Sequence, residues 1–189
     1  MRLLTDGPAN AKHVFILAHG AGAPMTHPWM NTVAQAMGEQ GIRVVRFNFP
    51  YMEAGRKVPD RQPVLLDAWR QVIEEHGGGK KVCIGGKPMG GRMASMVADE
   101  MDVRGLICFG YPFHPPGKPE QTRTAHLEQL RTPTLILQGT RDPFGTREDV
   151  AAYKLSKKIR IEWVEKGDHS LKGGLEGAIA SAVLFNTEH

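Results

Sequence analysis

Cysteines and long apolar runs are scarce in this sequence, and each shortage excludes a class of protein. No apolar run reaches the roughly 18 residues that a membrane-spanning helix needs, and the first residues hold no apolar stretch of signal-peptide length. The only cysteines, Cys83 and Cys108, both lie in apolar runs. They favour buried, reduced thiols in a cytoplasmic protein over a disulfide between neighbouring strands, and two thiols alone cannot form a tetrahedral zinc site.

The excess of basic over acidic residues is small. Lys and Arg number 24 against 20 Asp and Glu, which gives a net charge of +4. The nearest approach to a basic cluster, Lys154 to Arg160, is typical of a solvated helix end, so we expect neither nucleic acid nor a membrane as a partner. With 189 residues, of which 41% are hydrophobic, the chain is expected to form one domain over residues 1–189.

Short apolar runs alternate with amphipathic helical patterns along the chain. Most of the six runs are continuous, as in strands that are covered on both faces, and they span residues 13–18, 42–48, 81–85, 104–110, 133–138 and 159–164. Apolar residues at helical spacing, such as Met30, Val33 and Met37, lie between them. This alternation predicts an α/β fold with a doubly wound, mostly parallel six-stranded sheet.

Glycine-rich and polar segments follow four of the predicted strands. In an open α/β sheet the ligand site lies beyond the carboxyl ends of the strands. Residues 19–23, 85–91, 139–143 and 167–170 therefore converge on one rim, where they supply glycine backbone, the acid Asp142 and the base His169. His19, His27, Asp142, Asp168 and His169 have no metal-ligand spacing, so no metal site is predicted.

Three motifs together carry a resemblance to a known family. They are His19-Gly-Ala-Gly-Ala-Pro-Met, Arg46-Phe-Asn-Phe-Pro-Tyr-Met-Glu and Gly85-Gly-Lys-x-Met-Gly-Gly-Arg-Met-Ala-Ser. These motifs, together with the chain order of oxyanion loop, nucleophile elbow, acid and histidine, resemble the α/β-hydrolase superfamily. Within it, the chain is most similar to compact bacterial hydrolase-like proteins related to the testis-expressed and NSL-complex hydrolase-like domains. The resemblance runs from about Lys12 to the C-terminal helical pattern.

The resemblance implies a minimal hydrolase fold without a cap domain, acting on a small-molecule ester or acyl substrate without a cofactor. It maps the elbow G-x-S-x-G onto residues 86–90, the acid onto Asp142 and the general base onto His169. It also implies an oxyanion hole formed by the backbone N–H groups of Ala21 and Met89. Residues just past strand ends are candidates for substrate binding, with local packing as the alternative: His19, Trp29, Tyr111, Phe113 and Phe144.

Pro88 occupies the position at which the resemblance implies a nucleophilic serine. Proline has no hydroxyl, and its φ is fixed near about −65°, whereas a nucleophile elbow is a strained turn. Ser95, Ser170 and Cys83 are not placed to substitute for the serine. The sequence therefore predicts a hydrolase-type protein with impaired activity, with a non-catalytic binding module of the same fold as the alternative.

Two further predictions concern polar residues outside the motif positions. His126 is expected to be a surface or strand-end residue, and Arg92, in the elbow motif, is expected to form ion pairs on a helix surface. The Gly86-Lys87 pair does not mark a phosphate-binding loop, because Lys81 and Pro88 stand where that motif requires glycine and a hydroxyl residue.

Overall fold

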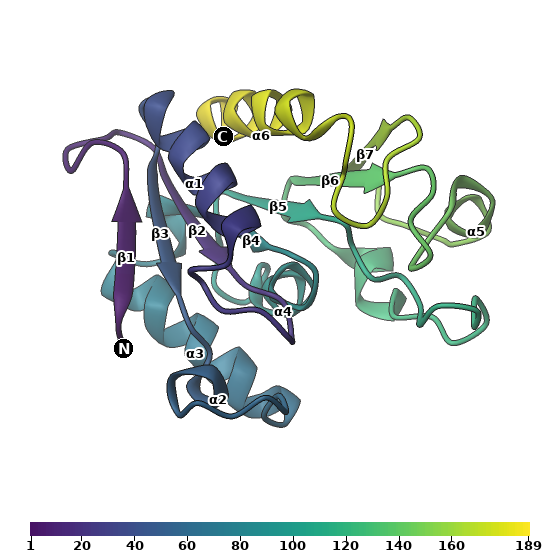
Figure 1. Ribbon diagram of the computed structural model, residues 1–189, viewed down its shortest axis with the longest axis horizontal. Helices are drawn as coiled ribbons and strands as arrows, with labels where there is room; N and C mark the ends of the chain where they lie inside the picture. Colours follow the sequence, from purple (N-terminus) through teal and green to yellow (C-terminus); the bar gives the residue numbers. More distant parts are fainter.

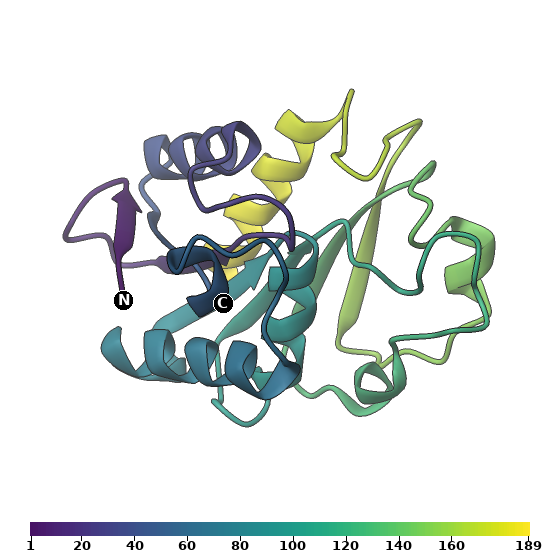
Figure 2. The same cartoon turned by 60° about the horizontal axis from the view of Figure 1, so that its bottom comes forward.

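The computed structural model describes residues 1–189 and shows a sheet covered by helices on both faces (Figures 1 and 2). Its seven strands lie in the order β1-β3-β2-β4-β5-β6-β7. Their bounds are β1 Leu3–Asp6, β2 Val14–Ala18, β3 Arg43–Phe47, β4 Val82–Gly86, β5 Gly105–Phe109, β6 Thr134–Gly139 and β7 Ile159–Val164. Strands β2 to β7 are parallel and correspond to the six strands that the sequence predicted.

The predicted strand count of six is one too low, because β1 was missed. This strand pairs antiparallel with β3 at the sheet edge, where Leu3 lies opposite Phe47. It has only four residues, none of them fully buried, so it lacks the continuous apolar run that marked the other strands. Edge strands of this length leave little periodic signal in a sequence.

The helices form two layers. Helices α1 (Pro28–Glu39) and α6 (Leu175–Glu188) pack on one face of the sheet, and α3 (Gln62–Glu75) and α4 (Met89–Val97) pack on the other (Figure 2). Shorter helices are α2 (Pro50–Glu53) and α5 (Arg147–Ala151), and two 3₁₀ turns span Gly79–Lys81 and Ala125–Gln129. None of the helices combines the length and apolar character that crossing a bilayer requires.

Local sequence explains where several helices begin. A proline stands in the first turn of α1, α2 and α3, where its missing N–H is not needed. Helix α5 begins with a capping box in which Thr146 and Asp149 bond to each other's backbone amides. These signals explain the starts of α1, α2 and α5, which follow β2, β3 and β6, and the start of α3, which follows α2.

Two hydrophobic clusters hold the layers together, one on each face of the sheet. The cluster under α3 and α4 has 26 buried residues and includes Cys108, whereas the cluster under α1 and α6 has 18 and includes Cys83. Both cysteines are buried and free. Because their side chains point to opposite faces of the sheet, they cannot form the disulfide considered as the less favoured alternative.

Candidate active site

The loop after β2 packs directly against the junction between β4 and α4. The amide of Lys87 donates to the Ala18 carbonyl at 3.1 Å, and the amide of Gly90 donates to the His19 carbonyl at 3.1 Å. A Cβ at Gly20 would lie 2.7 Å from Cδ of Pro88, so only glycine allows this approach. The backbone that would form an oxyanion hole is thus held beside the predicted elbow.

Asp142 and His169, the predicted acid and base, follow β6 and β7 and lie side by side. His169 Nδ1 donates to Asp142 Oδ2 over 2.8 Å. The carboxylate is fully buried and also accepts Nε2 of Gln138 at 3.0 Å and the amide of Phe144 at 2.9 Å. Three donors therefore fix the acid, and the acid in turn fixes the orientation of the imidazole ring.

The second ring nitrogen of His169 has no partner. Nε2 is buried and makes no hydrogen bond. Phe144 covers the ring, with a centroid separation of 4.4 Å. Gly110, at φ 66°, also packs closely against His169, because a Cβ there would lie 2.9 Å from the His169 carbonyl oxygen. Since Nδ1 is bonded to Asp142, the unpartnered nitrogen points away from the acid.

Lys87, which sequence reasoning considered only for a phosphate loop, belongs to this site. Its ammonium donates to the carbonyl oxygen of His169 and lies 5.2 Å from the ring centroid of Trp29. Burial lowers the pKa of Lys87 to about 8, although the charges of Asp142 and Asp168 oppose this shift. The only sequence signal for this role is a lysine directly before the nucleophile position.

Pro88 adopts an ordinary helical conformation. Its φ of −77° and ψ of −38° lie in the right-handed helical region, and it is the residue before the first turn of α4. The strained backbone of a nucleophile elbow is therefore absent, as the fixed φ of proline requires. The side chain offers no atom that could attack a carbonyl or bond to His169.

The two predicted oxyanion donors lie on either side of this junction. Ala21 is exposed, and its amide makes no hydrogen bond within the protein. The Ala21 carbonyl accepts the hydroxyl of Tyr51 at 2.7 Å, which holds the loop in place. Met89 is the first residue of α4, so its amide has no partner within the helix. Both N–H groups could therefore be offered to a ligand.

The five predicted substrate-binding residues divide into two groups. Trp29 and Phe144 are partly exposed beside His169. His19, Tyr111 and Phe113 are buried, the last two within the cluster under α3 and α4. We therefore place these three in the scaffold beneath the rim.

His19 links two loops of that scaffold. Its Nδ1 donates to the Gly20 carbonyl at 2.6 Å, and its Nε2 accepts the amide of Phe49 at 3.0 Å. Both ring nitrogens are thus used within the protein, and burial lowers the pKa of His19. The neutral ring connects the loop after β2 to the loop after β3, which gives it a structural position.

His126 is not the surface residue that the sequence suggested. Its Nε2 lies 2.8 Å from the buried hydroxyl of Ser95 and 3.4 Å from the hydroxyl of Tyr111. Burial, followed by the charge of Arg92, lowers the pKa of His126 to about 4. No periodic or motif signal marks this residue, because the contact joins a 3₁₀ turn to α4 across 31 positions of the sequence.

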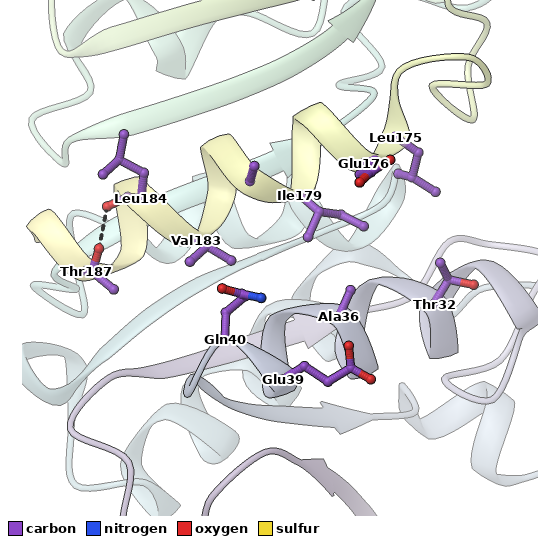
Figure 3. Close-up of a pocket in the computed structure, with 11 residues that line it drawn as sticks. Thr32, Ala36, Glu39, Gln40, Leu175, Glu176, Ile179, Val183, Leu184 and Thr187 are labelled. Atoms are coloured by element: carbon purple, nitrogen blue, oxygen red, sulfur yellow. Dashed lines mark hydrogen bonds between the residues drawn. The ribbon is translucent and has the colours of Figure 1, made fainter.

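A separate groove runs between α1 and α6 (Figure 3). Ala36, Ile179 and Val183 line it together with polar residues such as Glu39 and Gln40. It contains neither Pro88 nor the acid–base pair, so it does not form part of the candidate active site. No group of three or more His, Cys, Asp or Glu side chains is arranged to hold a metal ion.

Together, the fold and the site define a compact α/β hydrolase without a lid. The sequence pattern of the alpha/beta hydrolase domain family matches residues 11–178, and the chain belongs to this family. The predicted superfamily and fold class are thereby confirmed. The narrower relation to the testis-expressed and NSL-complex hydrolase-like domains stays a prediction.

Solved structures of several hydrolases share this fold. An alpha-beta serine hydrolase homologue from Coxiella burnetii has a TM-score of 0.73 at 22% identity, over 98% of this chain and 90% of that chain. A serine hydrolase without a lid from Xanthomonas campestris has a TM-score of 0.76 at 20% identity, over 96% and 87%. The esterase domain of a Rhodothermus marinus protein has a TM-score of 0.70 at 16% identity, over 98% and 97%.

Proposed function

We propose that this protein is a hydrolase of the serine ester or acyl type whose nucleophile position is filled by Pro88, so that the Pro88 chain hydrolyses esters weakly. The observation that carries this proposal is the unpartnered Nε2 of His169. A buried polar nitrogen without a partner is uncommon and costs free energy. A serine hydroxyl at the elbow is the partner that this nitrogen has in a complete triad.

With serine in place of Pro88, the reaction would follow from the groups at the rim. The hydroxyl oxygen would form a bond to the ester carbonyl carbon while His169 Nε2 takes its proton. The N–H groups of Ala21 and Met89 would stabilise the oxyanion. The bond to the alcohol would then break, and His169 would return the proton to the leaving oxygen. A water molecule, deprotonated by the same nitrogen, would release the acid and regenerate serine.

The other rim residues support this chemistry without reacting. Asp142 orients His169, and Lys87 holds the His169 backbone through its carbonyl oxygen. Trp29 and Phe144 offer apolar surface to the acyl or alkyl part of a small ester. The proposed substrate is a small molecule because the fold has no lid to enclose a long chain, and no cofactor takes part.

We also propose a cytoplasmic location. It is supported by two cysteines that are buried and free rather than paired. Neither nucleic acid nor a membrane is a partner in this proposal.

A second candidate function is ligand binding without turnover. The helical φ and ψ of Pro88 favour it, because this backbone is a relaxed start of a helix rather than a strained elbow. In that case the same rim would bind an ester or a related ligand and leave it intact. The two candidate functions differ in one expected outcome: a hydroxyl at position 88 restores ester hydrolysis only if the protein is a hydrolase.

The test is the Pro88→Ser variant with short p-nitrophenyl esters. Loss of a triad serine costs about 10⁶ in kcat in a well-studied serine protease. Because the backbone at position 88 has a helical φ of −77°, we expect only part of the lost activity to return. The expected increase in kcat/KM over the Pro88 chain is at least about 10³. Pro88→Ala is the matched control, since it frees the backbone in the same way but adds no hydroxyl.

Labelling with a fluorophosphonate probe gives a second readout. We expect the probe to modify the Pro88→Ser variant. It should modify neither Pro88→Ala nor the double variant that combines Pro88→Ser with His169→Ala. A folded Pro88→Ser variant that is both inert and unlabelled would favour the binding module. Labelling of the Pro88 chain itself would reveal another nucleophile and overturn the assignment.

A further inference from the structure

The sheet ends in two edge strands that differ in how well they are protected. At one edge, β1 has only four residues and pairs antiparallel with β3. At the other edge, β7 has six residues, pairs only with β6 and contains neither proline nor lysine (Figure 1). Proteins commonly protect a free edge by keeping it short or by placing such residues in it. The first edge is protected by its shortness, whereas the second is not protected in either way.

The backbone of β7 presents unpaired groups along this edge. The carbonyls of Lys158 and Val164 each accept, at 3.0 Å, an amide that lies on β6 or directly after it. Because backbone groups alternate in direction along a strand, those of Ile161 and Trp163 point away from β6, as does the carbonyl of Ile159. None of these outward groups forms a hydrogen bond within the chain. The edge can therefore accept another strand.

The side chains of β7 are covered less than those of the inner strands. Ile161 and Trp163 pack against the cluster under α3 and α4 but stay partly exposed, whereas β4 and β5 are buried throughout. Arg160 and Glu162 lie on the opposite face, where the guanidinium of Arg160 is 5.9 Å from the ring centroid of Phe185. One face of the edge is thus apolar and the other is charged.

The two charges on β7 have opposite signs and stand two residues apart. Nη2 of Arg160 lies 3.2 Å from Oε1 of Glu162, and the two side chains are 51% and 37% exposed. Arg92, for which the sequence predicted ion pairs, takes part in none of the eleven ion pairs of the structure. Arg160 and Glu162 therefore form an exposed pair, and each side chain has free surface for a second ionic contact.

A second copy of β7 fits this edge in one register. A closed dimer places the same surface of both copies about a two-fold axis. In an antiparallel ladder, residues with outward backbone groups must lie opposite each other, so near the middle of the strand the axis can pass through position 160, 161 or 162. An axis at Arg160 or at Glu162 sets two like charges opposite each other. An axis at Ile161 sets Arg160 of each copy opposite Glu162 of the other.

The face of the edge beside α6 leaves room for a neighbouring strand. A groove of about 380 Å³ lies between β7 and α6, and Glu162 lines it. On α6 its walls are Gly177, Ala178 and Ser181, whose side chains are small. A long side chain from a second copy could therefore lie across the edge and reach Glu162.

We propose that this protein forms a two-fold symmetric dimer in which β7 pairs antiparallel with β7 of a second copy, centred on Ile161, so that the two sheets become one. The amide of Ile161 would donate to the carbonyl of Ile161 in the second copy, and the amide of Trp163 to the carbonyl of Ile159 there. Ile159 and Trp163 would also meet as an apolar cross-strand pair. This interface involves neither Pro88 nor His169, so it does not depend on the proposed function.

The first experiment measures the mass of the Pro88 chain by sedimentation velocity between about 1 and 200 µM. We expect a reversible change from the 20.8 kDa monomer to a dimer, with a Kd in the micromolar range because a six-residue ladder is a small interface. A chain that stays monomeric at the highest concentration overturns the proposal.

The second experiment tests the register by exchanging charges. Arg160→Glu and Glu162→Arg each set like charges opposite each other, so each should raise the Kd at least about tenfold. An equimolar mixture of the two variants should regain the parent Kd, because the acidic pair of one copy then faces the basic pair of the other. Asp67→Arg, on α3 at a side chain that is 72% exposed, is the control for net charge and should associate like the parent. Dimerisation that both variants leave unchanged, or a mixture that does not associate, overturns the β7 interface.

Hydrogen exchange locates the interface without any substitution. The outward amides of Ile161 and Trp163 should exchange at least about tenfold more slowly in the dimer than in the dilute monomer, because they gain hydrogen bonds. The amides of β1, at the other edge of the sheet, are the internal control and should not change. A dimer in which β7 exchanges as fast as in the monomer refutes the proposal, even if the charge variants do not fold.

Discussion

The two sides of the rim differ in how completely they are built for chemistry. On the side of β6 and β7, Asp142 accepts three hydrogen bonds and holds His169 in one orientation. On the side of β2 and β4, Pro88 packs against Gly20 and offers no reactive atom. The proposed acid–base side therefore has its internal hydrogen bonds in place, although no nucleophile stands at position 88.

This difference shows that the hydrogen bonds that fix Asp142 do not involve the elbow side. The bonds to Asp142 come from Gln138, Phe144 and His169, all of which lie on or after β6. The elbow side is stable for its own reason, since proline suits the start of α4. An intact acid–base pair is therefore no measure of activity, because local hydrogen bonds alone can preserve it.

The largest effect is expected at Asp142, where one substitution should affect both ester hydrolysis and the stability of the fold. In Pro88→Ser, Asp142→Asn should lower kcat by about 10⁴, because the amide can support the wrong imidazole tautomer. In the Pro88 chain the same change should lower the free energy of unfolding by about 1–3 kcal/mol, because it replaces a buried acceptor with a donor that opposes Gln138 or His169.

The measurements are steady-state ester hydrolysis and urea denaturation. Asp67→Asn is the matched control, because Asp67 is 72% exposed on α3 and should change neither quantity appreciably. If Asp142→Asn left the Pro88 chain as stable as its parent, the three hydrogen bonds would not be what preserves the acid–base side. The fixed orientation of His169 would then need another cause.

A smaller effect is expected at Lys87, which connects the two sides. It precedes Pro88 in sequence but donates to the carbonyl of His169. In Pro88→Ser, Lys87→Met should lower kcat about tenfold with little change in KM, because the charge-assisted bond that positions the base is lost. Lys80→Met, at a side chain that is 83% exposed, is the control.

A pH profile distinguishes this positioning role from simple packing. Because the pKa of Lys87 is lowered to about 8, the ammonium loses its proton above that pH and its bond to the His169 carbonyl weakens. The kcat of Pro88→Ser should therefore fall above about pH 8, and this limb should be missing in Lys87→Met. A limb that persists in Lys87→Met would assign the titration to another group.

The sequence predicted the parts of the molecule that leave periodic or motif signals. Continuous apolar runs located β2 to β7, and the glycine-rich strand ends located Asp142 and His169. It missed β1, whose four residues are half-exposed, and it missed Lys87, whose role depends on a carbonyl 82 residues away. Contacts between distant loops leave no local pattern, which also explains why the sequence left both substrate binding and local packing open for Tyr111 and Phe113, two side chains that are buried.

The smallest expected effect tests the elbow side further along α4, where His126 contacts Ser95. Burial lowers the folded-state pKa of His126 to about 4, from an ordinary value of 6.5. Between these values the unfolded chain binds a proton that the folded chain does not, so stability is lost as the pH falls below about 6.5 and levels off below about 4. Because His126 is only partly buried, we expect a loss of about 1 kcal/mol, or roughly 2–4 °C in Tm.

Thermal unfolding followed between about pH 7 and pH 4.5 measures this contribution as the difference between the parent and His126→Gln. Over that range the Tm of the parent should fall further than the Tm of the variant. His189→Gln, at the exposed C-terminus, is the matched control. Equal losses in parent and variant would mean that the elbow side accommodates a charged His126. The polar contacts under α4 would then be loose, and the two sides of the rim would differ in rigidity as well as in chemistry.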